Sequence, residues 1–143
     1  MTTIQQPPAH VQYAPCSQNE MEIVAATLIK EAGGESTAGM QAVFNVIWNR
    51  AKGNSCQAAH VCLVPRAFTV WNGKNAASVI ATAKSHPCWQ QAMLLTTLGL
   101  QGKLADITGG ANHFYNPHKA HPAWAKKMTL TKVIGRHAFL KGN

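Results

Sequence analysis

Acidic residues are scarce in this chain of 143 residues. Five Asp and Glu stand against 13 Lys and Arg, which gives a formal net charge of +8 at pH 7. This balance favours an anionic partner, such as nucleic acid, a membrane surface or an anionic cell wall. No long basic run is present, so charge alone does not separate a binding face from a solvated surface. The basic residues are densest near the C-terminus, at Lys126, Lys127, Lys132, Arg136 and Lys141.

Long apolar runs are also missing. No stretch approaches the ~20 apolar residues of a membrane span, so we expect none. The N-terminus lacks the basic start and apolar core of a secretory signal, and we interpret residues 1–16 as an extended arm. Synthesis should then end in the cytoplasm. Residues 17–143 are long enough for one domain with its own core, and we expect a monomer.

The four cysteines show no CxxC pair, which argues against a zinc module. A cytoplasmic origin favours free thiols, whereas export would allow a disulfide, with three possible connectivities for two bridges. No cofactor is expected. The cysteines are Cys16, Cys56, Cys62 and Cys88.

Two amphipathic helices are predicted in the first third of the chain. Ser17 and Glu20 have the spacing of a capping box, and the Gly33–Gly34 pair ends the first helix. Ser36 or Thr37 can cap the second helix, which Gly53 closes. Apolar residues recur at helical spacing in both. They are Met21, Val24, Ala25 and Leu28 in the first helix, and Met40, Val43, Phe44, Ile47 and Ala51 in the second.

Further elements are predicted more coarsely. Residues 68–71 form a strand-like run before the Asn72–Gly73 turn. Residues 75–84 are predicted to be helical, and Pro87 suits the start of a further helix that ends near Gly102, with Ser85 or His86 as its cap. Residues 129–141 fit either short strands or a terminal helical turn. The fold class is therefore mainly α with a small β element.

Two of the few carboxyl groups flank the predicted corner between the first two helices. Glu31 follows Leu28 by three residues and so shares the apolar face at the C-terminal end of its helix, where burial and the helix dipole both raise its pKa. Glu35 precedes the next helix, where the dipole favours the carboxylate. One group suits proton donation and the other suits staying ionised. The alternative is a solvated helix end beside a helix-favouring residue.

Residues 29–50 resemble the opening motif of the SleB family of cell wall hydrolases, which includes spore-cortex-lytic enzymes and phage relatives. Three later blocks, "PRAFTVWNGK", "ITGGANHFYNP" and "TKVIGRHAFLK", are similar to family stretches in the same order. The resemblance covers about residues 17–141. Met40 is inserted between two motif positions, which is a departure. The motif residues matched are Glu31, Glu35, Gly39, Gln41, Ala42, Val43, Val46, Asn49 and Arg50.

The resemblance implies a lysozyme-like, single-domain α+β fold that cleaves the MurNAc–GlcNAc backbone of peptidoglycan, as a lytic transglycosylase that forms 1,6-anhydro-MurNAc. The catalytic Glu of the family maps onto Glu31, as general acid and then base. Glu35 would orient groups or, in a hydrolytic muramidase, activate water. Ala32 stands where many lysozyme-like transglycosylases have Ser, so a hydrogen bond to the acid is missing or supplied elsewhere.

Candidate substrate-binding residues come from two of the blocks. Tyr115 can stack on a sugar and Asn116 can hydrogen-bond an N-acetyl group. Thr69, Trp71 and Asn72 form a second candidate edge, although a Trp before an Asn-Gly turn is also typical of a hairpin. Phe114 is interpreted as a core aromatic.

Other functions remain open at this stage. His113, His118 and His121 could bind zinc with Glu31 as base, but no H-E-x-x-H motif is present. A nucleic-acid-binding module would use the charge, yet no basic-aromatic platform is present and no stable nucleic-acid partner is expected. A wall-binding remnant would keep the fold without activity. We expect a peptidoglycan-cleaving phage endolysin that reaches the wall by a holin-type route, with a secreted antibacterial effector as the alternative.

Overall fold

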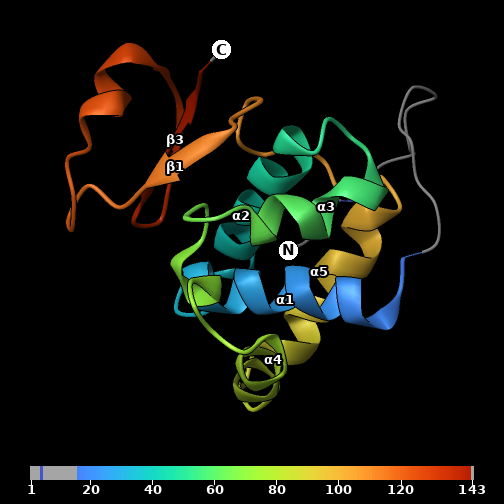
Figure 1. Ribbon diagram of the computed structural model, residues 1–143. Coiled ribbons are helices and arrows are strands. Elements are labelled where there is room, and N and C mark those ends of the chain that lie inside the picture. The colour runs from blue at the N-terminus through green and yellow to red at the C-terminus, as the bar shows by residue number, and fades with distance from the viewer. Residues whose placement is uncertain (1–3, 5–15, 143) are drawn as a thin grey trace.

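The computed structural model describes residue 4 and residues 16–142. Within them the chain forms a helical bundle with a small antiparallel sheet beside it (Figure 1). The expected extended arm, residues 1–16, lies outside the described residues except for Ile4 and Cys16. Ile4 forms an isolated antiparallel bridge with Leu104.

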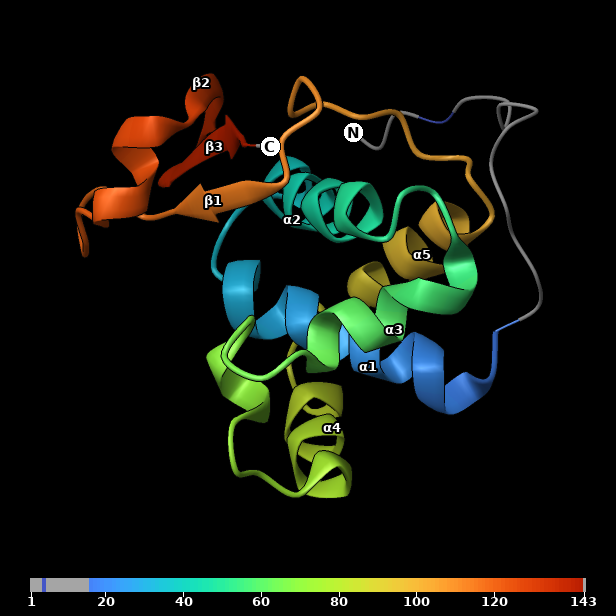
Figure 2. The same ribbon diagram turned by 45° about the horizontal axis from the view of Figure 1, so that its top comes forward.

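Helix α1, Gln18–Ala32, is the centre of the bundle and contacts α2, α3, α4 and α5 (Figure 2). Its predicted capping box is present in both directions. Ser17 Oγ accepts from the Glu20 amide at 3.1 Å, and Glu20 Oε1 accepts from the Ser17 amide at 2.9 Å. Val24 and Leu28 are fully buried. The predicted apolar face therefore forms the core, and Gly33 caps the end of the helix.

Helix α2, Thr37–Arg50, begins at Ser36, whose hydroxyl accepts from the Gly39 amide. Its buried face includes Val43, Phe44 and Ile47, as predicted. Helix α5, Trp89–Leu100, packs against it at Gly99. A Cβ at Gly99 would overlap the Phe44 ring, so the close approach of the two helices requires glycine there.

Helix α3, Ser55–Leu63, was not predicted from the sequence. Asn54 caps it by accepting from the Cys56 amide at 3.0 Å. Its buried residues are Ser55, Ala58, Ala59 and Cys62, which have helical spacing but are all small. Small residues carry little hydrophobic signal, and this explains why periodicity missed the helix.

The strand-like prediction for residues 68–71 is wrong, because Thr69–Trp71 forms the 3₁₀-helix η1. This run has β-propensity, but within the described part of the chain no strand pairs with it. Instead Trp71 Nε1 donates to Thr27 Oγ1 at 2.9 Å, and Asn72 Oδ1 accepts from the Arg66 amide at 3.2 Å. The first bond holds the segment against α1, and the second closes the loop around η1.

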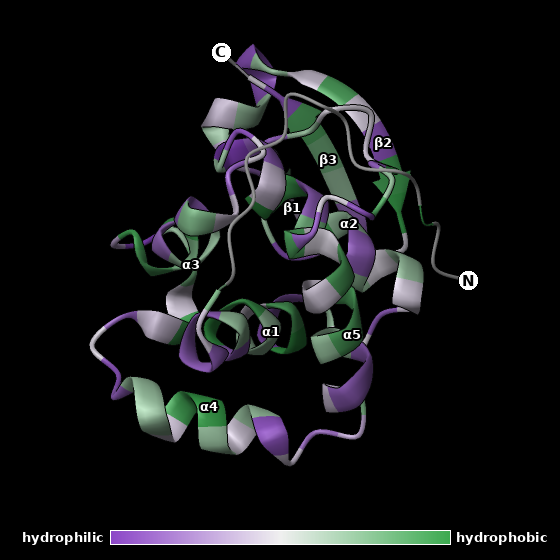
Figure 3. Ribbon diagram, turned by 90° about the vertical axis from the view of Figure 1, so that its right-hand side faces the viewer, coloured by the Kyte–Doolittle hydropathy of each residue, from purple (hydrophilic) through white to green (hydrophobic). Residues whose placement is uncertain are grey.

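Helix α4, Ala76–Lys84, agrees with its prediction and is capped by Asn75. The predicted cap of α5 is wrong: the helix begins at Trp89 after Cys88, with no side-chain cap. Both predicted caps make other bonds. Ser85 Oγ donates to the Thr82 carbonyl, and His86 Nδ1 accepts from the Cys88 amide. The apolar stretches of α1, α4 and α5 can be followed in Figure 3.

The C-terminal region forms strands, which decides between the two options left by its sequence. The sheet has the order β1-β3-β2, from His113–Tyr115, His137–Lys141 and Thr129–Ile134, with η2, Ala123–Lys127, between β1 and β2. Phe114 pairs with Phe139 across β1 and β3. Phe139 is fully buried against α2 residues Ala42 and Val46, and this second core fixes the sheet to the bundle.

Cys56, Cys62 and Cys88 are free thiols, which is one of the two states that the sequence left open. Cys62 lies in the core, and burial raises the pKa of its thiol to about 12. Cys16 Sγ donates to the Ser55 carbonyl at 3.6 Å. Among residues 4 and 16–142, no helix combines the length and apolar character needed to cross a bilayer.

Candidate active site

A cleft of about 570 Å³ lies where the end of α1, the end of α2, the η1 segment and the sheet meet. We call it the catalytic cleft. Among the described residues that line it, Glu31 is the only acidic one. The cations that line it are Lys30, Arg50, Arg66 and Lys119. A single carboxyl group thus faces a basic cleft, and the excess positive charge matches the charge of the whole chain.

Glu31 occupies the last turn of α1 and is half-buried. Burial raises the pKa of its carboxyl group above the ordinary value, while the charges of Lys30 and Arg50 oppose this rise. Within the described part of the chain, no hydrogen bond or ion pair holds this carboxyl group. The bond that a Ser at position 32 would supply is therefore not replaced by one from another described residue. Such a group suits a proton donor that opens onto a cleft.

Polar residues of α2 position the opposite wall. Gln41 Nε2 and Asn45 Nδ2 both donate to the Ala105 carbonyl, and Asn49 Nδ2 donates to the Ala111 carbonyl at 2.8 Å. Arg50 Nε donates to the Asn112 carbonyl at 2.7 Å. These bonds hold residues 105–112, which lead directly into β1, and so set β1 across the cleft from Glu31.

Asp106 has a structural place in the same segment. Its Oδ1 accepts from the Thr108 amide and hydroxyl at 2.7 and 2.6 Å, and its Oδ2 accepts from Asn49 Nδ2 and the Gly110 amide. These four donors hold both carboxylate oxygens in place. It fixes the turn before β1 and does not line the catalytic cleft.

Strand β1 and the residue that follows it bring Tyr115 and Asn116, the two candidate sugar-binding residues, to the lining of the catalytic cleft. The Tyr115 ring meets Trp124 edge to face at 5.9 Å, which places an aromatic pair beside the cleft. Asn116 Oδ1 accepts from the His118 amide at 2.8 Å, so its NH₂ group is the part left for a ligand. Phe114 bridges both cores, in agreement with its interpretation as a core aromatic, and also lines the cleft.

Of the three residues in the second predicted binding edge, one lines the catalytic cleft and two do not. Thr69 lines the catalytic cleft. Trp71 and Asn72 do not, because the indole is bonded to Thr27 and the amide of Asn72 holds the Arg66 backbone. Their described contacts stabilise η1, which in turn carries Thr69.

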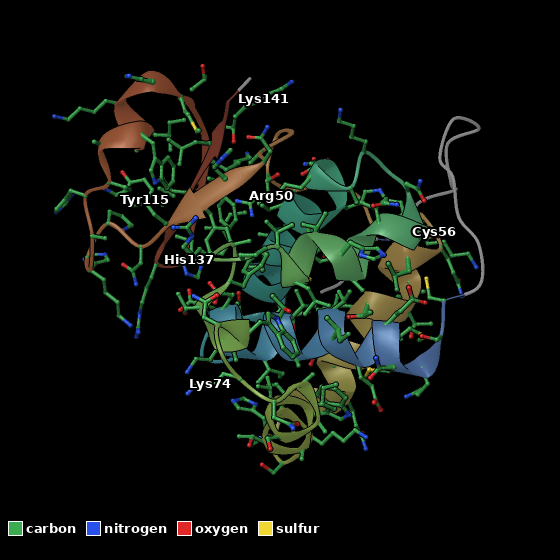
Figure 4. All side chains as sticks on the ribbon, viewed as in Figure 1. Arg50, Cys56, Lys74, Tyr115, His137 and Lys141 are labelled. Atoms are coloured by element: carbon green, nitrogen blue, oxygen red, sulfur yellow. The ribbon has the colours of Figure 1, made fainter. Side chains whose placement is uncertain are left out.

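Several residues of the catalytic cleft had no site role predicted from the sequence, and Arg50 and His137 are two of them (Figure 4). Arg50 was matched only as a motif position, although its charge acts on Glu31 and its guanidinium lies 5.5 Å from the Phe68 ring centroid. His137 is 8% exposed, and its buried Nδ1 has no hydrogen-bond partner among residues 4 and 16–142. Burial lowers the pKa of His137, and its ring meets Phe114 edge to face at 5.1 Å. The "GRHAF" block carried a signal for it, but only packing places it at the cleft.

Glu35 lies in contact with the turn between β2 and β3. Its Oε1 accepts from the Arg136 amide at 3.0 Å, and its Oε2 lies 3.9 Å from Arg136 Nε. The contact is close: a Cβ at Gly135 would overlap Glu35 Oε1. Glu35 does not line the catalytic cleft, and it holds the turn that leads into His137.

The three histidines considered for zinc are not brought together. Among the described residues, no three His, Cys, Asp or Glu side chains gather in a way that could hold a metal ion. His113 Nδ1 lies 2.8 Å from Asn112 Oδ1, and its ring packs on Trp124 at 5.4 Å. These side chains therefore offer no ligand set for a zinc hydrolase.

A family model described as Cell Wall Hydrolase matches residues 34–140. The chain belongs to this family. The match confirms the SleB-type resemblance drawn from the four sequence blocks. It includes Glu35 and begins after Glu31, so it does not by itself identify the catalytic residue.

Curated relatives point the same way. The spore cortex-lytic enzyme of Bacillus cereus is 34% identical over 128 residues, which cover 87% of this chain and 45% of that protein. The spore cortex-lytic enzyme of Oceanobacillus iheyensis is 30% identical over 135 residues, covering 87% and 42%. The chain thus spans less than half the length of these relatives.

Solved structures confirm the lysozyme-like α+β fold. The catalytic domain of the germination-specific lytic transglycosylase SleB from Bacillus anthracis has a TM-score of 0.68 at 29% identity, and covers 90% of this chain and 100% of its own. The catalytic domain of the Bacillus cereus SleB protein gives 0.69 at 29% identity, with coverage of 96% and 100%.

Proposed function

We propose that this domain cleaves the glycan backbone of peptidoglycan between MurNAc and GlcNAc, with Glu31 as the catalytic acid. The observation that carries the proposal is a half-buried carboxyl group with a raised pKa, alone among cations in a cleft of a cell wall hydrolase domain. The similar catalytic domain from Bacillus anthracis is described as a lytic transglycosylase, which supports the same reaction here.

The reaction needs only one carboxyl group. Glu31 donates its proton to the glycosidic oxygen, and the bond from that oxygen to C1 of MurNAc breaks. The resulting carboxylate takes the proton of the MurNAc 6-hydroxyl, while the 6-oxygen bonds to C1 and closes the 1,6-anhydro ring. The proton returns to Glu31, and no water is consumed. Acid and base are the same residue at successive steps.

The positions of the other carboxyl groups favour this route over hydrolysis. Glycosidases that use two carboxyl groups place them ~5–5.5 Å apart when retaining and ~6.5–9.5 Å apart when inverting. Neither Glu35 nor Asp106 lines the catalytic cleft, and each has other partners. A hydrolytic muramidase with Glu35 as the base is the alternative outcome.

The walls of the cleft suit a sugar. We assign Tyr115 to stacking on a sugar ring and the free NH₂ of Asn116 to an N-acetyl carbonyl, with Thr69 as a further hydroxyl contact. His137 is a buried ring with an unsatisfied nitrogen at the same cleft, and it gains a partner when substrate hydroxyl groups enter.

Mass spectrometry of the digest tests the reaction. Purified peptidoglycan treated with the protein should release muropeptides that end in anhydro-MurNAc. Reducing ends, heavier by one water, would establish the hydrolytic alternative. No cleavage by folded protein would overturn the proposal.

The biological setting within the proposal is that of a phage endolysin which reaches the wall through a holin-type route, with a secreted antibacterial effector as the alternative. A charge of +8 suits action at an anionic wall. Expression in a bacterial host should cause lysis only when a holin is produced with it. Lysis without a holin would contradict this setting but not the chemistry.

A further inference from the structure

A second cleft, of about 850 Å³, lies between α1, η1 and α4. We call it the α4 cleft. Its volume falls within the ~300–1,000 Å³ of ligand-binding clefts. Lys30 and Thr69 line both this cleft and the catalytic cleft, so the two share a wall. Because Lys30 precedes Glu31 in α1, the α4 cleft begins one residue from the proposed catalytic acid.

The α4 cleft is cationic and partly apolar. Lys30 and Lys74 (Figure 4) line it, and none of the described residues in its lining is acidic. Neither lysine forms an ion pair within the described part of the chain. Lys84 on α4 lies outside the lining and pairs with Glu22 at 2.9 Å. The remaining wall includes the apolar side chains of Ile29, Val70 and Val79.

The chemistry of peptidoglycan requires space of this kind beside the reacting bond. Each peptide stem is attached through a lactyl ether to O3 of MurNAc, the sugar whose C1 bond is broken in the proposed reaction. The stem therefore leaves the glycan close to Glu31. Stems carry free carboxylates together with alanine methyl groups, a combination that two unpaired lysines and an apolar wall complement.

We propose that the α4 cleft binds the acidic peptide stem of the muramoyl residue at the cleavage site. The inference rests on the proposed function, because the glycan must lie in the catalytic cleft for its stem to pass the wall at Lys30 and Thr69. Lys74 then pairs with a stem carboxylate, and the domain cleaves glycan that carries stems faster than bare glycan.

Kinetics on two forms of one substrate test this assignment. Wall glycan with stems is compared with the same glycan after an amidase has removed them. Lys74→Gln should lower kcat/KM about two- to fivefold on the stem-bearing form, as for one partly exposed ion pair, with the loss confined to that form. Lys103→Gln removes the same charge on the loop after α5, outside both clefts, and should change neither rate. No loss with Lys74→Gln, or an equal loss on both substrates, would overturn the assignment.

A bulky variant gives a second readout that does not depend on one charge. Ser78→Trp places an indole in the lining of the α4 cleft at an exposed position of α4, so the fold should tolerate it. Its melting temperature should match wild type, while the preference for stem-bearing glycan disappears. An unchanged preference would mean that stems do not enter this cleft.

Binding of a soluble stem separates this inference from the proposed function. The tripeptide L-Ala-γ-D-Glu-diaminopimelate is titrated into labelled protein and followed by NMR. Amide shifts should concentrate at Lys74, Ser78 and Val79 and weaken in Lys74→Glu. Shifts elsewhere, or none, would refute the assignment even if glycan is cleaved. If these shifts appear but no glycan is cleaved, the proposed function fails and the α4 cleft remains a peptide site.

Discussion

At the scale of single residues, the function depends on one carboxyl group. Glu31→Gln keeps the shape of the side chain and removes its exchangeable acid proton. We expect the rate of glycan cleavage to fall at least ~10²-fold, the low end of the contribution of general acid–base catalysis. The assay is muropeptide release, with circular dichroism to show that the variant is folded.

Glu35→Gln is the matched control for this experiment, because it makes the same chemical change at the other carboxyl group of the motif. Its effect on the rate should be much smaller, since Glu35 does not line the catalytic cleft. Wild-type rates in folded Glu31→Gln together with loss of activity in Glu35→Gln would reverse the two roles.

Glu31 also links activity to stability. Burial raises its pKa above the ordinary 4.5, so the folded state binds a proton more tightly than the unfolded chain does. Stability from this group is therefore fully present below the unfolded pKa and is lost as the pH rises through the folded pKa. Glu31→Gln should then raise the melting temperature relative to wild type at pH 8, with a smaller or reversed difference at pH 4. An equal shift at both pH values would mean that burial does not perturb this carboxyl group.

At the scale of elements, sequence patterns among neighbouring residues correctly predicted those helices whose ends and buried faces depend on neighbouring residues. The capping box and the apolar spacing of α1 and the Ser cap of α2 are properties of neighbouring residues, and both helices were predicted correctly. Residues 68–71 have β-propensity, but a tertiary bond from Trp71 to Thr27 overrides it. Helix α3 was missed because it buries small residues such as Ala58.

The residues of the candidate site also fall into two groups: those that the local sequence pattern predicts and those that depend on tertiary packing. The position of Glu31 on an apolar face was predictable from spacing along one helix, and so was its raised pKa. The places of Arg50 and His137 depend on the packing of α2 and β3 against residues more than sixty positions away, which one helix or strand pattern cannot encode. The sequence blocks that resemble the family include Arg50 and His137, but they did not indicate what these two residues do.

The hairpin of β2 and β3 offers a test of how Glu35 acts. Gly135 has φ +58°, and a Cβ there would overlap Glu35 Oε1. Gly135→Ala should therefore cost ~1–2 kcal/mol for the left-handed backbone and a further amount for displacing Glu35. Activity should fall with it, because the turn leads into His137. Chemical denaturation and muropeptide release measure the two effects.

Gly73→Ala is the control that isolates the backbone cost. Gly73 has a similar φ of +63°, but a Cβ there meets nothing within 4 Å. The difference in free energy of unfolding between the two variants reports the contact of Glu35 with the hairpin. Equal losses would mean that Glu35 can move away freely and does not position the turn.

At the scale of the whole molecule, we expect the surplus of positive charge to attract the protein to the anionic cell wall. Peptidoglycan is anionic, and attraction between exposed charges is screened beyond ~8 Å at about 0.15 M salt. The C-terminal lysines are all exposed, on η2 and on the sheet. Wall binding and lysis rate should both decrease as NaCl rises from tens to hundreds of millimolar, while cleavage of short neutral oligomers should hardly change. The residues concerned are Lys126, Lys127, Lys132 and Lys141.

Replacing these four lysines by Gln should reproduce the effect of high salt at low salt. The variant should sediment less with purified walls and lyse them more slowly, because fewer molecules are held at the surface. Its rate per bound molecule should equal that of wild type, since none of the four lines the catalytic cleft. If lysis is independent of salt and the variant binds walls as wild type does, the charge serves solubility, and the two clefts alone hold the substrate.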